Sequence, residues 1–450
     1  MKAALMTKGF IVTLALAGGL LLSGCSFKTP APKPLSSFSQ DPALYLASSY
    51  ALDQEREQAL AKDYLTRHLS PWSSTAPREN RLSAFWGLRS AKSHPGYGEN
   101  RLPNSKEWIE RLEYEMNEEG YPSLLESGII TQDTDARVMP THKPRFYDFK
   151  KAGEGYPFDY WQNSYLFSGT PVLITHATRD REWFYVEASF VSGWVRSLAV
   201  ARASSAFKGE VEGVLGWAIP LNDSIPLYDS QGEFLDRARL GKLYPIYALE
   251  GETLMLKVPK RGASGEAIWQ ESQVSRSDFA PFPLSFTPEN GARLAAKLMG
   301  EKYGWGGMYG NRDCSAMVRD LVGSMGVWLP RNSAAQAKFQ GGFVDLSALE
   351  PKEKESRILA EAIPWASLLY LKGHIMLYIG EHKGRAMVLH DAWGIRTEGS
   401  EGEGRLILGG VVITDLSVGE GVEGVKEKSL LLHRLEGFRN LLSPLEIKKP

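Results

Sequence analysis

The chain has 450 residues, of which 43% are apolar and 23% are charged, a composition typical of globular proteins. This composition excludes a disordered, collagenous or coiled-coil protein, and the length predicts roughly three or four packed units. Lysine and arginine (52) nearly balance aspartate and glutamate (53), which gives a formal net charge of −1. Such a balance provides no electrostatic basis for binding nucleic acid, and we expect no nucleic-acid partner.

The N-terminus has the pattern of a secretory signal. Lys2 and Lys8 precede an apolar run over residues 9–22, which is shorter than the roughly 20 apolar residues that span a bilayer. The run ends at Leu22-Ser-Gly-Cys25, which resembles the lipobox of bacterial lipoproteins. That resemblance implies removal of residues 1–24 and lipidation of Cys25, so the protein would be anchored to a membrane of the bacterial cell envelope. The alternative is an ordinary signal peptide in which Cys25 has no role.

The residue after Cys25 also bears on location. Ser26 rather than Asp follows the lipidation site, which by analogy favours the outer membrane in a Gram-negative cell, with the body of the protein on the periplasmic side. Residues 25–42 are rich in Pro and Ser and too poor in apolar residues to pack, so we expect a lipidated tether.

The next segment, residues 43–145, is predicted to form a helical N-terminal domain. Leu60, Tyr64 and Leu65 have helical spacing within a helix expected over Gln54–Leu69. A second helix is expected after an N-cap at Asn104 or Ser105. No catalytic pattern occurs here, and we expect a packing role.

Two stretches of short β-branched and aromatic runs predict two small barrels. Residues 146–205 resemble bacterial SH3-like domains, with strands expected at 171–175, 183–187 and 193–195. Residues 206–286 predict a second, more divergent barrel, with strands expected at 225–228, 243–247 and 253–257. The last domain, residues 287–450, opens at Thr287, which precedes a proline at the first helical position and so predicts a helix start.

Cys314 has the setting of a nucleophile. It follows a glycine-rich segment and opens a helical pattern of apolar residues. The positive end of a helix stabilises a thiolate over a thiol, so this position indicates a reactive cysteine. A buried, inert cysteine is the alternative. Cys25 lies far away in a different context, and we expect no disulfide between the two.

A cysteine nucleophile needs a base, and four histidines follow it in the sequence. His374 begins one apolar strand and His390 ends the next, and the polar segment between them predicts a hairpin loop. The hairpin would bring His374 and His390 roughly opposite each other. His382 would lie at the solvated tip, and His433 is expected at the surface or a strand end.

Four motifs in this region resemble the NlpC/P60 family of cell-wall cysteine peptidases, in the order and at the separations of that family. They are Tyr303-Gly-Trp-Gly-Gly307, Asp313-Cys-Ser-Ala316, Leu329-Pro-Arg-Asn-Ser-Ala-Ala-Gln336 and Gly373-His-Ile-Met-Leu-Tyr-Ile-Gly380. The helical segment and two barrels upstream are similar to lipoprotein members of the family. The resemblance implies an α+β multidomain protein whose catalytic domain has a circularly permuted papain-like fold.

The resemblance also implies catalytic roles. Cys314 would attack the carbonyl carbon, His374 would take the thiol proton and later protonate the leaving amine, and His390 would orient His374. Asp391 is a less favoured substitute for His390. The backbone N–H of Cys314, with Tyr303, would stabilise the oxyanion.

The family's substrates are peptidoglycan stem peptides, cut between γ-D-Glu and the diamino acid, which is diaminopimelate or Lys. Members with a barrel against the cleft resemble enzymes that require a free N-terminal L-Ala, and Asp313, Ser315 and Ser333 occupy the positions that would bind it. In the alternative reading, Asp313 only caps the helix and Ser315 satisfies its first turn. Arg331 is considered an ion-pair partner without a chemical role.

The leading hypothesis is therefore a membrane-tethered cysteine endopeptidase of murein fragments, expected to be a monomer. A catalytically idle scaffold that binds peptidoglycan through its barrels is one alternative, and a thiol acyltransferase is another. A metal hydrolase is disfavoured because the sequence has no His-Glu-x-x-His and no paired cysteines at ligand spacing. We expect no metal and no other cofactor.

Overall fold

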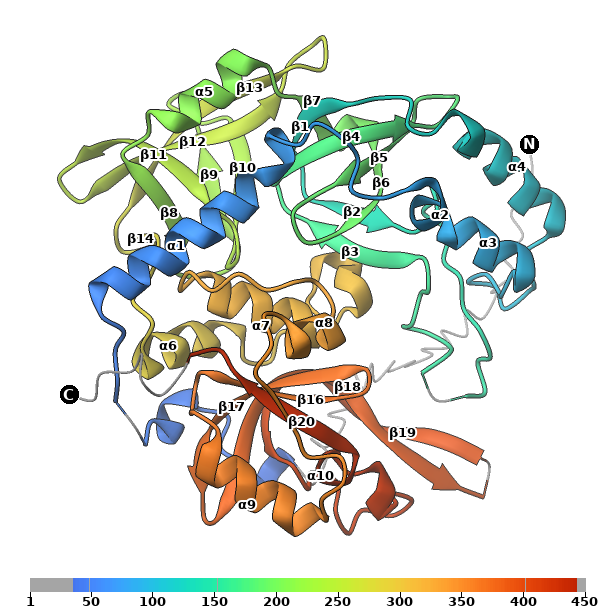
Figure 1. The fold of residues 1–450 in the computed structure, drawn as a ribbon, viewed down its shortest axis with the longest axis vertical. Helices are drawn as coiled ribbons and strands as arrows, with labels where there is room; N and C mark the ends of the chain where they lie inside the picture. The colour runs from blue at the N-terminus through green and yellow to red at the C-terminus, as the bar shows by residue number, and fades with distance from the viewer. Residues whose placement is uncertain (1–34, 48, 152, 401, 443–450) are drawn as a thin grey trace, which may run out of the picture. The chain divides into compact units, whose positions relative to one another are not determined.

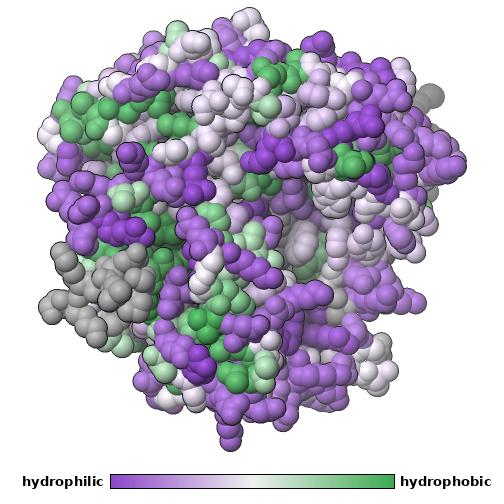
Figure 2. Space-filling model, in the orientation of Figure 1, coloured by the Kyte–Doolittle hydropathy of each residue, from purple (hydrophilic) through white to green (hydrophobic). Residues whose placement is uncertain are grey.

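The computed structural model describes residues 35–442 except positions 48, 152 and 401. The predicted signal segment, the predicted lipidation site Cys25 and the first part of the predicted tether lie outside the described residues. The described residues all belong to one compact unit. Hydrophilic side chains dominate the face in Figure 2, with smaller hydrophobic areas, one of them at the upper left over the second barrel. Within the described part of the chain, no helix combines the length and apolar character that a membrane crossing requires.

The expected helices form. Asp53 caps α1 (Gln54–Leu69). Of the two predicted cap candidates, Ser105 is the N-cap of α4 (Lys106–Met116), and its hydroxyl accepts the backbone N–H of Trp108. The shorter helices of this region are α2 (Arg81–Ala84) and α3 (Trp86–Ser93), with 3₁₀ turns η1 (Leu35–Ser37), η2 (Pro42–Tyr45), η3 (Ser70–Trp72) and η4 (Glu118–Gly120).

The helices of this N-terminal segment pack on two different barrels. The third and fourth helices pack on the first barrel, where Leu88 and Ile109 share a core with Trp161 and Trp194. Helix α1 instead runs across the second barrel, apart from α3 and α4 (Figure 1), and its Tyr64 ring lies 5.2 Å from Phe282. A helix with a single apolar stripe is stabilised by whichever surface covers it, and here the covering surfaces belong to other domains.

The first barrel is a seven-stranded sheet with strand order β3-β2-β6-β5-β4-β1-β7. Its strands are β1 (Glu126–Ile130), β2 (Thr134–Arg137), β3 (Gln162–Leu166), β4 (Pro171–Ala177), β5 (Trp183–Glu187), β6 (Ser192–Arg196) and β7 (Val200–Arg202). The 3₁₀ turn η5 (Ser197–Ala199) connects β6 to β7. The three strands expected from sequence form. The sheet also includes β1, which pairs with β4 and with β7 and begins at residue 126, before the predicted start of the barrel at residue 146.

The second barrel contains a five-stranded sheet of order β13-β12-β11-β8-β14 and a two-stranded sheet of β9 and β10. Its elements are α5 (Ser205–Glu212), β8 (Gly216–Pro220), β9 (Ile225–Tyr228), β10 (Phe234–Ala238), β11 (Tyr244–Glu250), β12 (Thr253–Arg261), β13 (Ala267–Ser275) and β14 (Phe279–Pro281). The three strands expected here also form.

The last domain is built on an antiparallel sheet of order β15-β20-β16-β17-β18-β19. The strands are β15 (Phe343–Asp345), β16 (Ser367–Leu371), β17 (His374–His382), β18 (Arg385–Gly399), β19 (Gly402–Asp415) and β20 (Leu435–Asn440). The helices are α6 (Pro288–Leu298), α7 (Cys314–Gly323), α8 (Ser333–Lys338), α9 (Pro351–Glu361) and α10 (Leu431–Arg434), with 3₁₀ turns η6 (Trp305–Gly310) and η7 (Glu427–Ser429).

Helices cover this sheet on both faces. Successive residues of β17 point to opposite sides: Ile375 joins the core with Met317 of α7, and Met376 joins the core with Ile358 of α9. Figure 1 shows α6, α7 and α8 above the sheet and α9 and α10 below it. The α+β multidomain architecture with a helix-and-sheet catalytic domain, predicted from sequence, is confirmed.

The packed part of the chain begins before the predicted end of the tether at residue 42. The Gln40 side chain donates to the Ile413 carbonyl oxygen at 2.9 Å and accepts the Ile413 backbone N–H at 2.9 Å. Strand β19 is an edge of the sheet, so its outward backbone groups lack a strand partner, and a single amide side chain satisfies both. Tyr45 is also buried against this domain.

Candidate active site

Cys314 lies at the first residue of α7, as the sequence predicts. Its predecessor Asp313 is the N-cap, with Oδ1 accepting the backbone N–H of Ala316 at 2.9 Å. The thiol is buried, with 7% of the residue exposed, and the backbone N–H of Ile375 reaches it from the start of β17. The predicted nucleophile therefore lies where the helix terminus meets the strand that begins with His374.

The hairpin expected between the two histidines forms from β17 and β18, with His382 paired to Arg385 at the turn. It brings His374 Nε2 within 2.8 Å of His390 Nδ1. His390 is fully buried. His382 and His433 are exposed and lie outside this pair, as expected.

A threonine extends the histidine pair and determines where the protons lie. The Thr414 hydroxyl donates to the Asp415 carbonyl oxygen at 2.8 Å, so its oxygen is left to accept from His390 Nε2, 3.1 Å away. His390 therefore carries its proton on Nε2, and its Nδ1 accepts the Nε2–H of His374. The remaining nitrogen of His374, Nδ1, then holds a lone pair, as a general base requires. Nothing in the sequence around Thr414, on β19, indicated this role.

Asp391, the less favoured substitute for His390, does not take that position. His374 bonds to His390, and consecutive strand residues point to opposite faces. Within the described residues, neither carboxyl oxygen of the fully buried Asp391 has a hydrogen-bond partner. Burial, together with the negative charge of Asp313, raises the pKa of Asp391 well above its usual value, which keeps the carboxyl neutral.

Burial also sets the protonation of the reacting pair. It raises the pKa of the Cys314 thiol to about 12, and the negative charge of Asp313 acts in the same direction. Burial lowers the pKa of His374 to about 4, and the positive charge of Arg434 adds to that shift. The expected stabilisation of a thiolate by the helix terminus is thus outweighed by loss of solvent, and the resting pair is a neutral thiol and a neutral imidazole.

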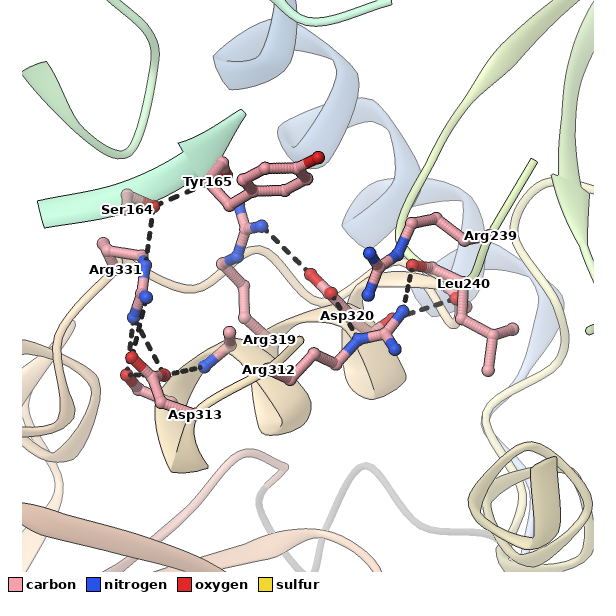
Figure 3. A network of polar contacts seen from close by, with 12 residues as sticks. Ser164, Tyr165, Arg239, Leu240, Arg312, Asp313, Arg319, Asp320 and Arg331 are labelled. Carbon is pink, nitrogen blue, oxygen red and sulfur yellow. Dashed lines mark hydrogen bonds and ion pairs between the residues drawn. The ribbon is translucent and has the colours of Figure 1, made fainter. Parts of the chain in front are cut away.

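Asp313 is held by Arg331, which the sequence analysis considered an ion-pair partner without a chemical role. Arg331 Nη1 and Nη2 donate to the two oxygens of Asp313 at 3.1 and 2.7 Å (Figure 3). The hydroxyl of Ser315 and the backbone N–H groups of Gly306 and Ala316 donate to the same carboxylate. Burial alone would raise the pKa of Asp313, but Arg331 and these hydrogen bonds hold it below its usual value. The capping role considered as an alternative is therefore present in the geometry.

Two arginines, Arg331 and Arg312, connect the surroundings of Cys314 to the two barrels (Figure 3). Arg331 Nε donates to the Ser164 hydroxyl of β3 at 2.7 Å. Arg312, two residues before the cysteine, donates to Asp320 at 2.8 Å and to the Leu240 carbonyl oxygen at 2.9 Å. Ser164 is 167 residues from Arg331 in sequence, so no local pattern could have revealed the contact.

Two glycines of the Tyr303 motif allow strand β3 of the first barrel to lie directly against this motif. Gly306 and Gly307 have φ of 60° and 87°, in the left-handed region. A Cβ at Gly307 would lie 2.4 Å from the Cβ of Tyr165 on β3, so any side chain there would displace the strand. Tyr303 itself is half-buried. Burial and then the nearby Cys314 raise its pKa well above the usual value, so the phenol keeps the proton that an oxyanion stabiliser donates.

Two cavities flank the reacting pair and share Tyr303, Trp305 and Gly373 in their walls. The cavity on the cysteine side measures about 670 Å³ and brings together Cys314, Asp313, Ser315 and Ser333 with Glu79 and Trp86 of the helical segment and Tyr160, Asn163 and Ser192 of the first barrel. The cavity on the histidine side measures about 550 Å³ and includes His374, His390, Trp393, Arg405 and Arg434. The sequence-predicted residues therefore meet in one cleft, and sequence analysis missed the walls that other segments supply.

Family models match the chain in the order of its domains. Residues 14–121 match the N-terminal NLPC_P60 stabilising domain, residues 144–196 an SH3 domain of SH3b1 type, and residues 205–250 an SH3 domain of SH3b2 type. Residues 300–399, which contain Cys314, His374 and His390, match the NlpC/P60 family.

A solved structure shows the same fold. An NlpC/P60 endopeptidase from Photobacterium damselae subsp. piscicida has 24% sequence identity and a TM-score of 0.79, over 90% of this chain and 97% of that one. An NlpC/P60 family protein from Bacillus cereus has 14% identity and a TM-score of 0.47, over 70% and 100%. No curated protein sequence matches the chain. The four ordered matches place the chain in the NlpC/P60 family, with an N-terminal stabilising domain and two bacterial SH3 domains ahead of its C-terminal domain.

Proposed function

We propose that this protein is a peptidoglycan hydrolase, a cysteine endopeptidase that cuts stem peptides between γ-D-Glu and the diamino acid. The family match supports a peptidase of this kind, and the Photobacterium structure of the same fold is named as an endopeptidase. The observation that carries the proposal is the placement of Cys314 at a helix terminus beside the chain from His374 through His390 to Thr414. An idle scaffold would contain these residues only by coincidence. An acyltransferase would use them with an acceptor other than water.

The chemistry follows from the neutral resting pair. As Cys314 Sγ attacks the scissile carbonyl carbon, its proton moves to Nδ1 of His374, and the backbone N–H of Cys314 and the Tyr303 hydroxyl donate to the oxyanion. Collapse of the intermediate breaks the C–N bond, and His374 returns the proton to the leaving amine. Water then attacks the thioester, with His374 as base, and releases the acyl half and the thiol. His390 keeps His374 in the active tautomer throughout.

A free N-terminal L-Ala on the acyl half is part of the proposal. Residues from the first barrel and the helical segment wall the cavity on the cysteine side, which limits how much peptide can extend from the scissile bond. Ser315 and Ser333 line this cavity beside Asp313. Because five protein donors already bind Asp313, a substrate ammonium would share that carboxylate. Glu79, which accepts the Ser192 hydroxyl at 3.0 Å, offers a second carboxylate in the same wall.

Mass spectrometry of the products tests this function. The full-length protein in detergent is incubated with L-Ala-γ-D-Glu-diaminopimelate and, separately, with intact peptidoglycan, and Cys314→Ala is the control. Release of L-Ala-γ-D-Glu from the free peptide alone supports an amine-dependent enzyme of released fragments. Cleavage of intact wall supports a remodelling endopeptidase without the amine requirement. Absence of cleavage by the wild type in both assays would favour the binding scaffold.

The proposed location is the cell envelope, with Cys25 lipidated and the body on the periplasmic side of the outer membrane as a monomer. Labelling of the wild type but not of Cys25→Ser with a palmitate analogue, followed by membrane fractionation, tests the anchor. Light scattering of the detergent-extracted protein tests the monomer.

A further inference from the structure

The two cavities receive different halves of a cut peptide. In the proposed mechanism His374 protonates the leaving amine, so the leaving half departs on the histidine side. The cavity on that side includes His374 and His390, whereas the acyl half bonded to Cys314 lies in the other cavity. The side chains of the histidine-side cavity therefore select the residue that follows γ-D-Glu.

That cavity has an excess of positive charge. Its lining includes Arg396, Arg405, Lys428 and Arg434 and no aspartate or glutamate. Just outside it, Glu398 lies 3.3 Å from Arg396 and 3.7 Å from Lys428, and Glu403 also pairs with Arg396. Two of the four cations are therefore neutralised within the protein.

The other two cations are less fully compensated, since the only described acid that acts on Arg405 in this group is Glu403, which already pairs with Arg396. Within the described residues, neither Arg405 nor Arg434 forms an ion pair, and Arg434 makes one long hydrogen bond, 3.4 Å, to the carbonyl oxygen of Lys372. Burial lowers the pKa of Arg405, the negative charge of Glu403 opposes that shift, and the charges of Arg396 and Arg434 add to it. Arg405 and Arg434 both line this cavity. Like charges held together in a partly dehydrated cavity are unfavourable unless an anion joins them.

The rest of the lining is apolar and aromatic. Phe158 lies between Trp305 and Trp393, with ring centroids 5.1 and 6.4 Å away, and Leu408 and Leu431 complete the wall. Such a surface suits a chain of methylene groups. The cavity thus combines an apolar passage next to the histidines with four cations that, in the described part of the chain, only two neighbouring acids, Glu398 and Glu403, offset.

We propose that Arg405 and Arg434 bind a carboxylate on the side chain of the leaving diamino acid, so that the protein prefers diaminopimelate-type stem peptides to lysine-type ones. Diaminopimelate and lysine both present methylene groups and a terminal amine, but only diaminopimelate adds a carboxylate there. Guanidinium groups bind carboxylates in a planar, two-bond geometry, which suits this recognition. The inference rests on the proposed function, since it assigns the cavity to the leaving half of a stem peptide.

The test compares two peptides, L-Ala-γ-D-Glu-diaminopimelate and L-Ala-γ-D-Glu-L-Lys, which differ at that carboxylate. We expect the wild type to show a kcat/KM roughly tenfold or more higher for the first, a ratio consistent with charge-assisted hydrogen bonds. Arg405→Gln and Arg434→Gln should each reduce the ratio by slowing only the diaminopimelate peptide, and Arg405→Lys should restore part of it. Arg276→Gln, an equal charge change at an exposed turn of the second barrel, is the matched control and should leave the ratio unchanged.

The outcomes separate the two proposals. Equal kcat/KM for both peptides in the wild type, or equal slowing of both in the arginine variants, would overturn the inference and leave the proposed function intact. If neither peptide is cut, the proposed function fails, and calorimetry with Cys314→Ala decides the inference. Tighter binding of the diaminopimelate peptide that is lost in Arg405→Gln would support it, and equal binding of the two peptides would overturn it.

Discussion

Thr414 fixes the proton positions of the histidine pair from outside the reacting groups, so Thr414→Val tests the proton chain directly. The substitution keeps a branched side chain in a fully buried position and removes the hydroxyl that accepts from His390 Nε2. His390 then either keeps a buried N–H without an acceptor or moves its proton to Nδ1. In the second case His374 must hold its own proton on Nδ1, where the base should have a lone pair.

The magnitude follows from the lost acceptor. An unsatisfied buried polar group costs about 1–3 kcal/mol, which shifts the tautomer equilibrium by about 5- to 150-fold. Because only the active tautomer accepts the thiol proton, we expect kcat to fall by up to that factor. KM should change little, since Thr414 does not line either cavity.

Two assays measure the effect. Peptide hydrolysis gives kcat and KM, and the rate of Cys314 alkylation by iodoacetamide reports activation of the thiol without depending on the identity of the substrate. Thr414→Ser, which keeps the hydroxyl, is the matched control and should retain most of both rates, and the melting temperature shows whether each variant is folded. Wild-type kcat and alkylation in Thr414→Val would refute the proton chain, and equal losses in the Ser variant would assign the effect to packing.

Three further predictions concern the same site. Cys314→Ala should abolish hydrolysis with little change in melting temperature, because a small side chain fits the helix start; retained activity would remove Cys314 from the mechanism. Arg331→Met should lower the free energy of unfolding by about 3–5 kcal/mol in denaturant titrations, because it leaves the buried Asp313 unpaired; unchanged stability would contradict this account. The pH profile of kcat/KM should lose activity only as pH falls through about 4, since His374 is neutral above that pKa; a loss centred near 6.5 would show an unshifted histidine.

Sequence patterns predicted single elements better than their assembly. The cap at Ser105 and the helix start at Thr287 form as expected because each depends on side chains within one turn. The sequence did not reveal that α1 packs on the second barrel, because an amphipathic pattern specifies an apolar stripe and not the surface that covers it. Strand β1 was missed for a similar reason, since its pairing comes from β4 and β7, distant in sequence.

The sequence by itself determined the cysteine at the mouth of a helix and the hairpin that joins His374 to His390, because turn chemistry and strand alternation act over a few residues. Only the tertiary structure decided the neutral state of the reacting pair, the acceptor at Thr414 and the arginine that holds Asp313. These features depend on burial and on contacts between segments far apart in the chain. Local sequence carries neither quantity, since both arise when the two barrels and the sheet exclude water from the same cleft.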